Sequence, residues 1–344
     1  MMHRQIVLVA TLLALAIGCA RPPEPRYEAR GAEVRLSLLA LGDWGRRPKE
    51  GQTPAKQLRV AEALAAEDRR APADALIFVG DNFYPHGLEA SEVEMRLRAN
   101  LVGPYCHFVA LTARGAATLG EACLEPEARR HPLPLWAVLG NHDTSAESIA
   151  LERERVPLYV SNWKLLGLPV ETVELPQGVS LVFYDSTALH RTANAASLPL
   201  LTRALAQSRG PWRVLVAHHP LDGREVDVPI QRALAAAGVR AQLLLAGHIH
   251  DLRGAAGEAP QPAFQLVSGG GGGSESSHQT LPGELYQLAS TGFARIDLVG
   301  AGASAHLRLR LFAVSAVDVP RVVAAWTVSE SGAVTSETLG SAAE

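Results

Sequence analysis

Five short polar motifs stand directly after apolar segments, and their side chains are of the kinds that bind metal ions. The motifs are Gly42-Asp43, Gly80-Asp81-Asn82, Gly140-Asn141-His142-Asp143, His218-His219-Pro220 and Gly247-His248-Ile249-His250. Taken singly, an aspartate or asparagine of this kind could cap a turn, and a histidine could be a hydrogen-bonded core residue. Taken together, these groups would lose their hydration at the ends of buried strands, which costs free energy unless a bound cation compensates. The sequence therefore predicts a metal centre.

The kinds of donor atom narrow the choice of metal. Oxygen and imidazole donors without thiolates suit Zn, Fe or Mn, and they exclude a cysteine-type structural zinc site and an all-oxygen calcium site. The number of donors exceeds the needs of one ion. Two ions that share a bridging carboxylate polarise a phosphoryl group and generate a hydroxide nucleophile at mild pH. We therefore expect a dinuclear site, in which two bridged ions use the whole donor set.

The order of the motifs resembles the signature of the calcineurin-like metallophosphoesterase superfamily, from Leu38 to about His250. Most members have a histidine two residues after the first aspartate, whereas this chain has Gly45 at that position. The segment from Gly42 to Gly45 is instead similar to the purple acid phosphatase branch. In that branch a tyrosine three residues after the bridging aspartate binds ferric iron, and Tyr84 stands three residues after Asp81.

The resemblance implies a role for each motif residue. The ferric ion would be bound by Asp43, Tyr84 and His250, with Asp81 bridging the two ions, and the second ion would be bound by Asn141, His218 and His248. The second ion would be Fe, Zn or Mn. Hard anionic oxygens favour a trivalent ion, and neutral amide and imidazole ligands suit a divalent one. The alternative for Tyr84 is an aromatic side chain that only packs after its strand.

The same resemblance implies a catalytic pair and leaves one role open. His142 would contact the phosphate and protonate the leaving group, and Asp143 would hold His142 in place. Many relatives carry a second active-site histidine after the His-x-Pro motif, but the segment 221–228 has none, so His219 and His278 are the candidates to replace it.

The glycine run Gly269–Gly273 could be read as a phosphate cradle, but it lacks the Lys and Ser/Thr of a Walker loop. We expect instead that the backbone passes close to the metal site there, where side chains would collide.

From Val34 onward, short apolar segments alternate with amphipathic ones, which is the pattern of an α/β domain. Strands are expected at 34–41, 75–79, 135–139, 179–184, 213–217, 242–246 and 264–267, and helices at about 53–67, 200–207 and 230–237. Thr53 would cap the first helix, with Pro54 at its first position. The segment from Phe293 to about Val328 is expected to complete a sheet. The resemblance implies a four-layer α/β/β/α sandwich, a single catalytic domain that we place at residues 34–330, with a tail at 331–344.

The first residues indicate export. His3 and Arg4 precede an apolar segment, Ile6–Ile17, that is too short to span a bilayer, and residues 16–18 before Cys19 are similar to a bacterial lipobox. We expect residues 1–18 to be a lipoprotein signal peptide and Cys19 to carry the lipid that anchors the protein to a membrane, in the periplasm or at the cell surface. The proline-rich residues 19–33 would be a tether. The alternative is an ordinary secretory signal with an incidental cysteine.

Cysteine count and charge add two expectations. Cys106 and Cys123 remain as an even pair in an exported protein, which favours a disulfide over two buried thiols. The formal net charge is -3 with both signs interspersed, so no nucleic-acid partner is expected.

The function that this sequence favours is hydrolysis of small phosphomonoesters by an acid-phosphatase-like enzyme. A phosphodiesterase or nucleotide pyrophosphatase could use the same site. A surface lipoprotein that binds metal or phosphate without turnover is the alternative from another class, and a redox reaction of an iron pair with peroxide would be secondary.

Overall fold

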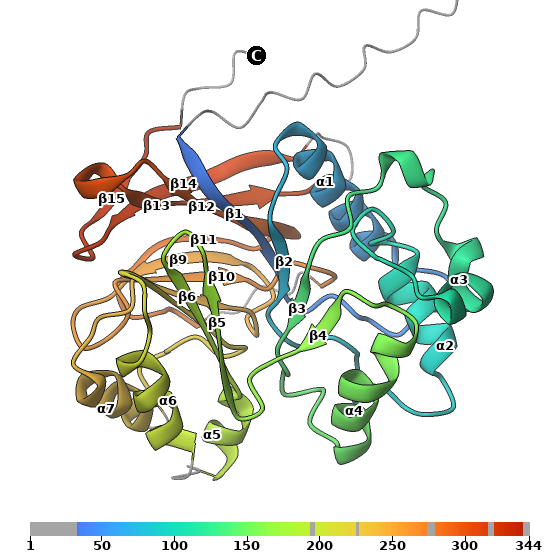
Figure 1. Ribbon diagram of the computed structural model, residues 1–344, viewed down its shortest axis with the longest axis horizontal. Helices are drawn as coiled ribbons and strands as arrows, with labels where there is room; N and C mark the ends of the chain where they lie inside the picture. The colour runs from blue at the N-terminus through green and yellow to red at the C-terminus, as the bar shows by residue number, and fades with distance from the viewer. Residues whose placement is uncertain (1–32, 193–196, 225–226, 274–278, 316–319, 340–344) are drawn as a thin grey trace, which may run out of the picture.

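Two β-sheets pack face to face at the centre of the molecule, and helices cover their outer faces (Figure 1). The computed structural model describes residues 33–192, 197–224, 227–273, 279–315 and 320–339. The predicted four-layer α/β/β/α sandwich is confirmed by this arrangement.

The eight-stranded sheet has the order β15-β14-β13-β12-β1-β2-β3-β4. Its strands are β1 (Val34–Leu41), β2 (Ala75–Phe78), β3 (Leu135–Ala137), β4 (Trp163–Leu165), β12 (Gly292–Val299), β13 (His306–Ala313), β14 (Arg321–Ser329) and β15 (Val334–Ser336). Strands β1 to β4 are parallel, and β12 joins β1 in antiparallel register. The C-terminal strands therefore complete a sheet, as expected. The predicted domain boundary at residue 330 falls inside that sheet, because β15 pairs with β14.

The seven-stranded sheet has the order β11-β9-β10-β8-β7-β6-β5. Its strands are β5 (Val170–Leu175), β6 (Val179–Tyr184), β7 (Trp212–Val216), β8 (Leu243–Ala246), β9 (Leu252–Ala256), β10 (Phe264–Ser268) and β11 (Glu284–Leu288). Strands β6, β7 and β8 are parallel neighbours, so their carboxyl ends lie at one edge.

The helices divide between the two outer layers (Figure 1). Beside the eight-stranded sheet lie α1 (Ala55–Arg70), α2 (Val93–Arg96), α3 (Ala113–Leu119) and α4 (Ala146–Ala150), with two π-helical segments, η1 (Leu97–Val102) and η4 (Leu151–Arg155), that continue α2 and α4. Beside the seven-stranded sheet lie α5 (Ser186–Thr192), α6 (Ser197–Ala206) and α7 (Val228–Ala237). Short 3-10 turns occur at Gly120–Ala122, Glu127–Arg129, Val156–Leu158 and Gly302–Ser304.

The alternation of side chains along β1 shows how the layers are held together. Leu38 and Ala40 point into the hydrophobic cluster between the two sheets, whereas Leu39 and Leu41 pack in the cluster under α1. Because successive side chains of a strand point to opposite faces, a strand buried on both sides needs an unbroken apolar sequence. That requirement explains why the expected strands were recognisable as short apolar runs.

Two local details bear on the predictions. The structure joins Cys106 to Cys123 by a disulfide, with Cα atoms 5.0 Å apart, so the predicted pairing is confirmed.

The predicted Thr53 cap is wrong: α1 begins at Ala55 after Pro54 without a side-chain cap, and the Thr53 hydroxyl donates instead to the carbonyl of Ala99 at 2.6 Å. Thr53 therefore ties the start of α1 to η1.

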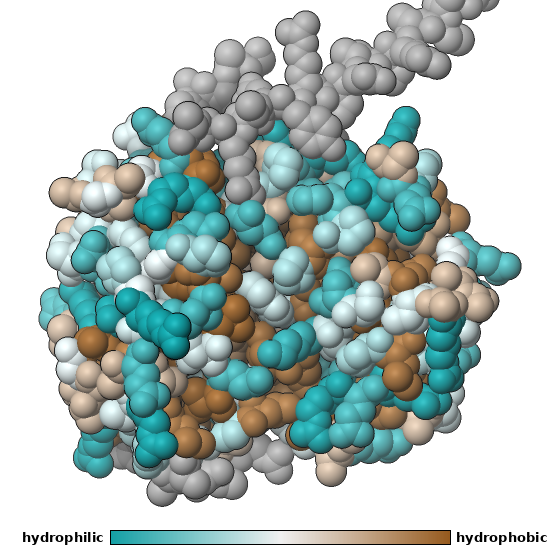
Figure 2. Space-filling model, in the orientation of Figure 1, coloured by the Kyte–Doolittle hydropathy of each residue, from teal (hydrophilic) through white to brown (hydrophobic). Residues whose placement is uncertain are grey.

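In the view of Figure 2, hydrophilic residues are spread over the whole face, with hydrophobic residues exposed between them. Within the described ranges, we find no helix of the length and apolarity that crossing a membrane requires.

Candidate metal centre

The five motifs follow the carboxyl ends of parallel strands from both sheets, and the fold brings them together. Asp43 follows β1, Asp81 follows β2 and Asn141 follows β3 in one sheet, and His218 follows β7 and His248 follows β8 in the other. The strand ends of open α/β sheets are where ligands commonly bind. The predicted convergence is therefore present in the described structure.

The backbone is strained at three of these positions. Asp43, Asp81 and His248 have φ angles of 61°, 50° and 70°, in the left-handed region that side chains other than glycine rarely adopt. Such conformations cost on the order of 1–3 kcal/mol each and persist where the surrounding structure demands them. The strain therefore marks positions at which side-chain direction is fixed by the fold.

The first group of donors surrounds Tyr84. Its hydroxyl donates to Asp43 Oδ1 at 3.0 Å and lies 2.9 Å from His250 Nε2, and that nitrogen lies 3.4 Å from Asp43 Oδ1. Donor atoms of Asp43, Asp81 and His250 all lie within 4.8 Å of one another. Burial, together with the carboxylates of Asp43 and Asp81, raises the pKa of Tyr84 well above its usual range. Ionisation of this phenol would therefore require a cation in the same group.

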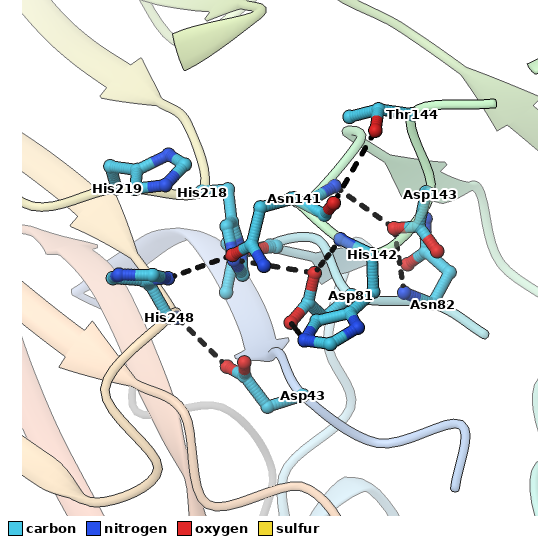
Figure 3. A network of polar contacts seen from close by, with 12 residues as sticks. Asp43, Asp81, Asn82, Asn141, His142, Asp143, Thr144, His218, His219 and His248 are labelled. Carbon is cyan, nitrogen blue, oxygen red and sulfur yellow. Dashed lines mark hydrogen bonds and ion pairs between the residues drawn. The ribbon is translucent and has the colours of Figure 1, made fainter. Parts of the chain in front are cut away.

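The second group surrounds the side-chain oxygen of Asn141 (Figure 3). Asn141 Oδ1 lies 3.1 Å from His218 Nε2 and 2.9 Å from His248 Nδ1. His218 Nδ1 lies 2.9 Å from the carbonyl oxygen of Val79, so Nδ1 carries the N–H that donates to this oxygen. The lone pair of His218 is then on Nε2, which lies 3.4 Å from Asp81 Oδ1 and is available to a metal ion. Burial, aided by His218, lowers the pKa of His248 to about 3, which keeps that imidazole in the neutral form that metal ions bind.

The two groups fit a pair of metal ions. Asp81 belongs to the first group and also lies beside His218 of the second, as a bridging carboxylate would. Asp43 and Asp81 are 0% and 1% exposed, and their polar contacts are imidazoles, a phenol and backbone N–H groups. Buried carboxylates in such surroundings are stabilised by bound cations. The described residues therefore include two neighbouring candidate groups of metal ligands.

His142 lies at the edge of this centre. Its backbone N–H donates to Asp81 Oδ1 at 2.9 Å, its Nδ1 lies 2.6 Å from the carbonyl oxygen of Pro85, and its Nε2 lies 3.9 Å from Asp81 Oδ2. The carbonyl of Pro85 is an acceptor, so it fixes the proton at Nδ1 and leaves Nε2 facing the centre. A surface hollow of about 480 Å³ adjoins the ring, and it is lined by Pro85, His86, Asn141, His142, Thr144 and Ser145. A substrate could therefore reach the predicted acid and the metal centre together.

Asp143 does not hold His142, and that part of the prediction is wrong. The fully buried carboxylate of Asp143 accepts hydrogen bonds from the backbone N–H groups of Asn82, Phe83 and Gly140 at 2.9–3.0 Å. Figure 3 shows Asp143 beside Asn82. Burial, with the nearby charge of Asp81, raises the pKa of Asp143 to about 7. Asp143 therefore joins the turns after β2 and β3, and the carbonyl of Pro85 orients His142.

Sequence reasoning missed two residues behind the centre. Asn82 donates from Nδ2 to the carbonyl of Val138 and to Glu152 Oε2, both at 2.9 Å, and Glu152 Oε1 accepts a hydrogen bond from Ser148 at 3.1 Å. Burial and the charge of Asp143 raise the pKa of Glu152 well above its usual range. Asn82 was visible as part of its motif, whereas nothing in the spacing of Glu152, within η4, pointed to the site.

The sequence of residues 36–252 matches the family described as calcineurin-like phosphoesterase. The chain belongs to this family. All five motifs lie within the matched residues. No curated protein matches the chain.

Solved structures share the fold of this phosphoesterase chain at low sequence identity. GAP50, the anchor in the inner membrane complex of Plasmodium, superimposes with a TM-score of 0.57 at 15% identity, over 84% of this chain and 88% of GAP50. Purple acid phosphatase PPD1 from yellow lupin seeds gives 0.56 at 14% identity, over 86% of this chain and 53% of that one. PhoD gives 0.55 at 11% identity, over 91% and 73%. At such identities these likenesses establish the fold alone.

His219 and His278 were the two candidates for a second active-site histidine, and the structure describes only His219. His219 is 6% exposed and lies beside the second donor group of the phosphoesterase, with its ring centre 4.9 Å from that of His218 and 4.3 Å from that of His248. His278 lies outside the described residues.

The glycine run has the steric role that we predicted. A Cβ atom on Gly269 would lie 2.0 Å from the carbonyl oxygen of Ile249, and on Gly271 it would lie 2.4 Å from that of Gly42. None of Gly269–Gly273 has a positive φ, so close approach and not backbone conformation requires glycine here. The run thus lies against the loop that carries Asp43.

Proposed function

We propose that this chain is a dinuclear-metal phosphoester hydrolase that acts on small phosphomonoesters, in the manner of an acid phosphatase. The observation that carries the proposal is the arrangement of the two donor groups, which meet at Asp81 with His142 and an open hollow beside them. Family membership alone supports the reaction class, and the donor set supports the use of two metal ions.

The ligand assignment proposed here is the one that the resemblance implies. Asp43, Tyr84 and His250 would hold a ferric ion, Asn141, His218 and His248 a divalent ion (Fe, Zn or Mn), and Asp81 both. When bound, the two ions polarise the phosphoryl group and supply a nucleophile from water at mild pH. Tyr84 and the two carboxylates favour the trivalent ion in the first position because they are hard, anionic oxygen donors.

The chain's own contribution to catalysis is to hold a proton at a defined atom. With the Nδ1 proton directed at the carbonyl of Pro85, a protonated His142 carries its second proton on Nε2, the nitrogen that faces Asp81. That proton can pass to the departing alcohol oxygen, which makes His142 a general acid. The hollow beside the ring would accept the alcohol portion of the substrate.

Two other functions use the same geometry. Hydrolysis of phosphodiesters or nucleotide pyrophosphates would use the same donor groups with a larger leaving group in the hollow beside His142. A binding role without turnover is a second alternative, because the same fold occurs in GAP50, which is described as an anchor. The complete donor set and the position of His142 favour turnover.

The experiment compares initial rates on an aryl phosphomonoester and a bis-aryl phosphodiester, for protein loaded with iron and zinc. We expect the monoester to be the better substrate, and Asp81→Asn to abolish hydrolysis, whereas Glu154→Gln, an exposed surface carboxylate, leaves it unchanged. A preference for the diester would favour the first alternative. Rates no higher than those of the free metal ions would contradict the proposal.

A further inference from the structure

His219 is a buried imidazole next to the second donor group and outside the predicted ligand set. Its ring lies between those of His248 and His190, with centres 4.3 Å from each. Ser186 of α5 orients it, because the Ser186 hydroxyl oxygen accepts the backbone N–H of His219 at 3.0 Å and lies 2.9 Å from His219 Nδ1. The ring is therefore fixed at both its backbone and its side chain.

The hydrogen bond to Ser186 allows a tautomer of His219 in which Nε2 is free to bind a metal ion. An oxygen has two lone pairs, so the Ser186 hydroxyl can accept both the backbone N–H and an N–H at Nδ1 of His219. In that tautomer the lone pair of His219 is on Nε2. In His218 the two ring nitrogens are arranged in the same way. Nδ1 lies against the carbonyl oxygen of Val79, and Nε2 faces Asn141. Such an outer hydrogen bond is the usual accompaniment of a metal-binding histidine.

The rings of His218, His219 and His248 lie close together at the second donor group. The separations of their centres are 5.1 Å for His218 and His248, 4.9 Å for His218 and His219, and 4.3 Å for His219 and His248. Donor atoms of the three side chains all lie within 4.8 Å of one another.

We infer that His219 is a further ligand of the second ion, so that this ion is held by three imidazoles together with Asn141 and Asp81. The inference rests on the two-ion centre of the proposed function and specifies its divalent half. Three imidazoles select a borderline ion such as zinc over the harder manganese ion, which prefers oxygen donors. His219 thus makes the second site one for zinc, or for a divalent ion of similar preference.

The test separates a ligand from a packing residue. His219→Phe keeps a flat ring between His248 and His190 but has no nitrogen to offer. His190→Phe is the matched control, because it changes the outer ring of the same stack, whose buried Nε2 has no hydrogen-bond partner among the described residues. We expect His219→Phe to weaken zinc binding at the second site by 10-fold or more while iron content stays at the parent level. We expect His190→Phe to bind zinc as the parent does.

A second measurement needs no variant. Zinc-edge X-ray absorption of the parent loaded with iron and zinc counts the imidazoles around the zinc ion, and the inference predicts three. Two imidazoles, or an unchanged zinc affinity in His219→Phe, would overturn it while leaving the proposed hydrolase intact. A parent that binds no divalent ion at all would contradict both the inference and the two-ion function. A preference for phosphodiesters would contradict only the proposed substrate class and would leave the inference about His219 unchanged.

Discussion

The position of one proton decides what His142 can do. Its Nδ1 is occupied by the carbonyl of Pro85, and its Nε2 faces the carboxylate that both donor groups share. The side chain is 35% exposed, so a substrate can contact it, whereas Asp81 beside it is buried. The family resemblance implied the role of His142, and the geometry is compatible with that role without a carboxylate partner.

Replacing His142 with Asn therefore tests catalysis apart from metal binding. We expect kcat to fall by about 10²–10⁴-fold, because a positioned general acid contributes on that scale. Metal content should stay at the parent level, since His142 is outside both donor groups. Steady-state kinetics with metal analysis of the same samples gives the answer. Unchanged kcat would show that His142 is not the general acid. Loss of a metal ion would show that the substitution acts through metal binding instead.

For Asp143 we expect a loss of stability and not of catalysis, because its three hydrogen bonds hold backbone turns together. In Asp143→Asn, one oxygen must serve three buried backbone N–H groups, and the amide hydrogens face those donors. An unsatisfied buried donor costs about 1–3 kcal/mol, so we expect the free energy of unfolding to fall by about 2–3 kcal/mol. Urea unfolding measures this. A variant of parent stability that loses turnover would restore the role that we first assigned to Asp143.

At the scale of elements, a polar cluster ties α1 to residues 103–134 between η1 and β3, here called the insertion. Asp68 of α1 accepts hydrogen bonds from the backbone N–H of Ala73 at 2.8 Å and lies 2.9 Å from ring nitrogens of both His107 and His131. The disulfide between Cys106 and Cys123 lies in the same insertion. Burial works to raise the pKa of Asp68, but His107, the Ala73 N–H and His131 outweigh it and lower the pKa below 3.8.

This shift predicts a pH dependence with a definite sign. A carboxyl whose pKa is lower in the folded chain stabilises the fold above its unfolded pKa, and that stability is lost as the pH falls through 3.8 and then through the folded value. We expect Asp68→Asn to lower the free energy of unfolding by about 1–3 kcal/mol at pH 6. The difference from the parent should shrink below about pH 4, and Glu127→Gln, exposed in the same insertion, should show neither effect. Denaturant unfolding across this pH range checks it, and a difference that does not change with pH would refute it.

The same elements show what the sequence could and could not predict. Strands β1, β2, β3, β7 and β8 were recognisable because a strand buried on both faces must be apolar, and the motifs at their ends followed from that. The hydrogen-bond partners of Asp143 could not be predicted from the sequence. The N–H groups of Asn82 and Phe83 are 61 and 60 residues away, and only the folded turns bring them near Asp143. His219 was a candidate by motif position, but its neighbours Ser186 and His190 come from α5, which no pattern connected to it.

For the whole molecule, the centre lies where the carboxyl ends of parallel strands from both sheets meet, so the fold and the site are inseparable. The eight-stranded sheet supplies Asp43, Asp81 and Asn141, and the seven-stranded sheet supplies His218 and His248. The hydrophobic cluster between the sheets fixes the two halves of the donor set relative to each other. Ligand geometry is thus set by packing across the whole sandwich.

Where the molecule resides is a separate proposal that rests on the residues before the sandwich. We propose that Cys19 carries a lipid that holds the phosphoesterase domain at a membrane outside the cytoplasm. In Cys19→Ser the thiol that would be lipidated is absent, so we expect the protein to leave the membrane fraction and the detergent phase. Detergent partitioning of the expressed chain measures this. Parent protein that already partitions into the aqueous phase would favour an ordinary secretory signal.

The central claim is a two-ion centre in which Tyr84 binds ferric iron. The measurement that tests it most directly is a visible absorption spectrum with metal analysis of the purified domain beside Tyr84→Phe. We predict a broad visible band from the tyrosinate on iron in the parent, about two metal ions per chain, and loss of the band in the variant. A colourless parent that holds two ions and hydrolyses phosphoesters would contradict the ferric assignment and leave Tyr84 as a packing residue.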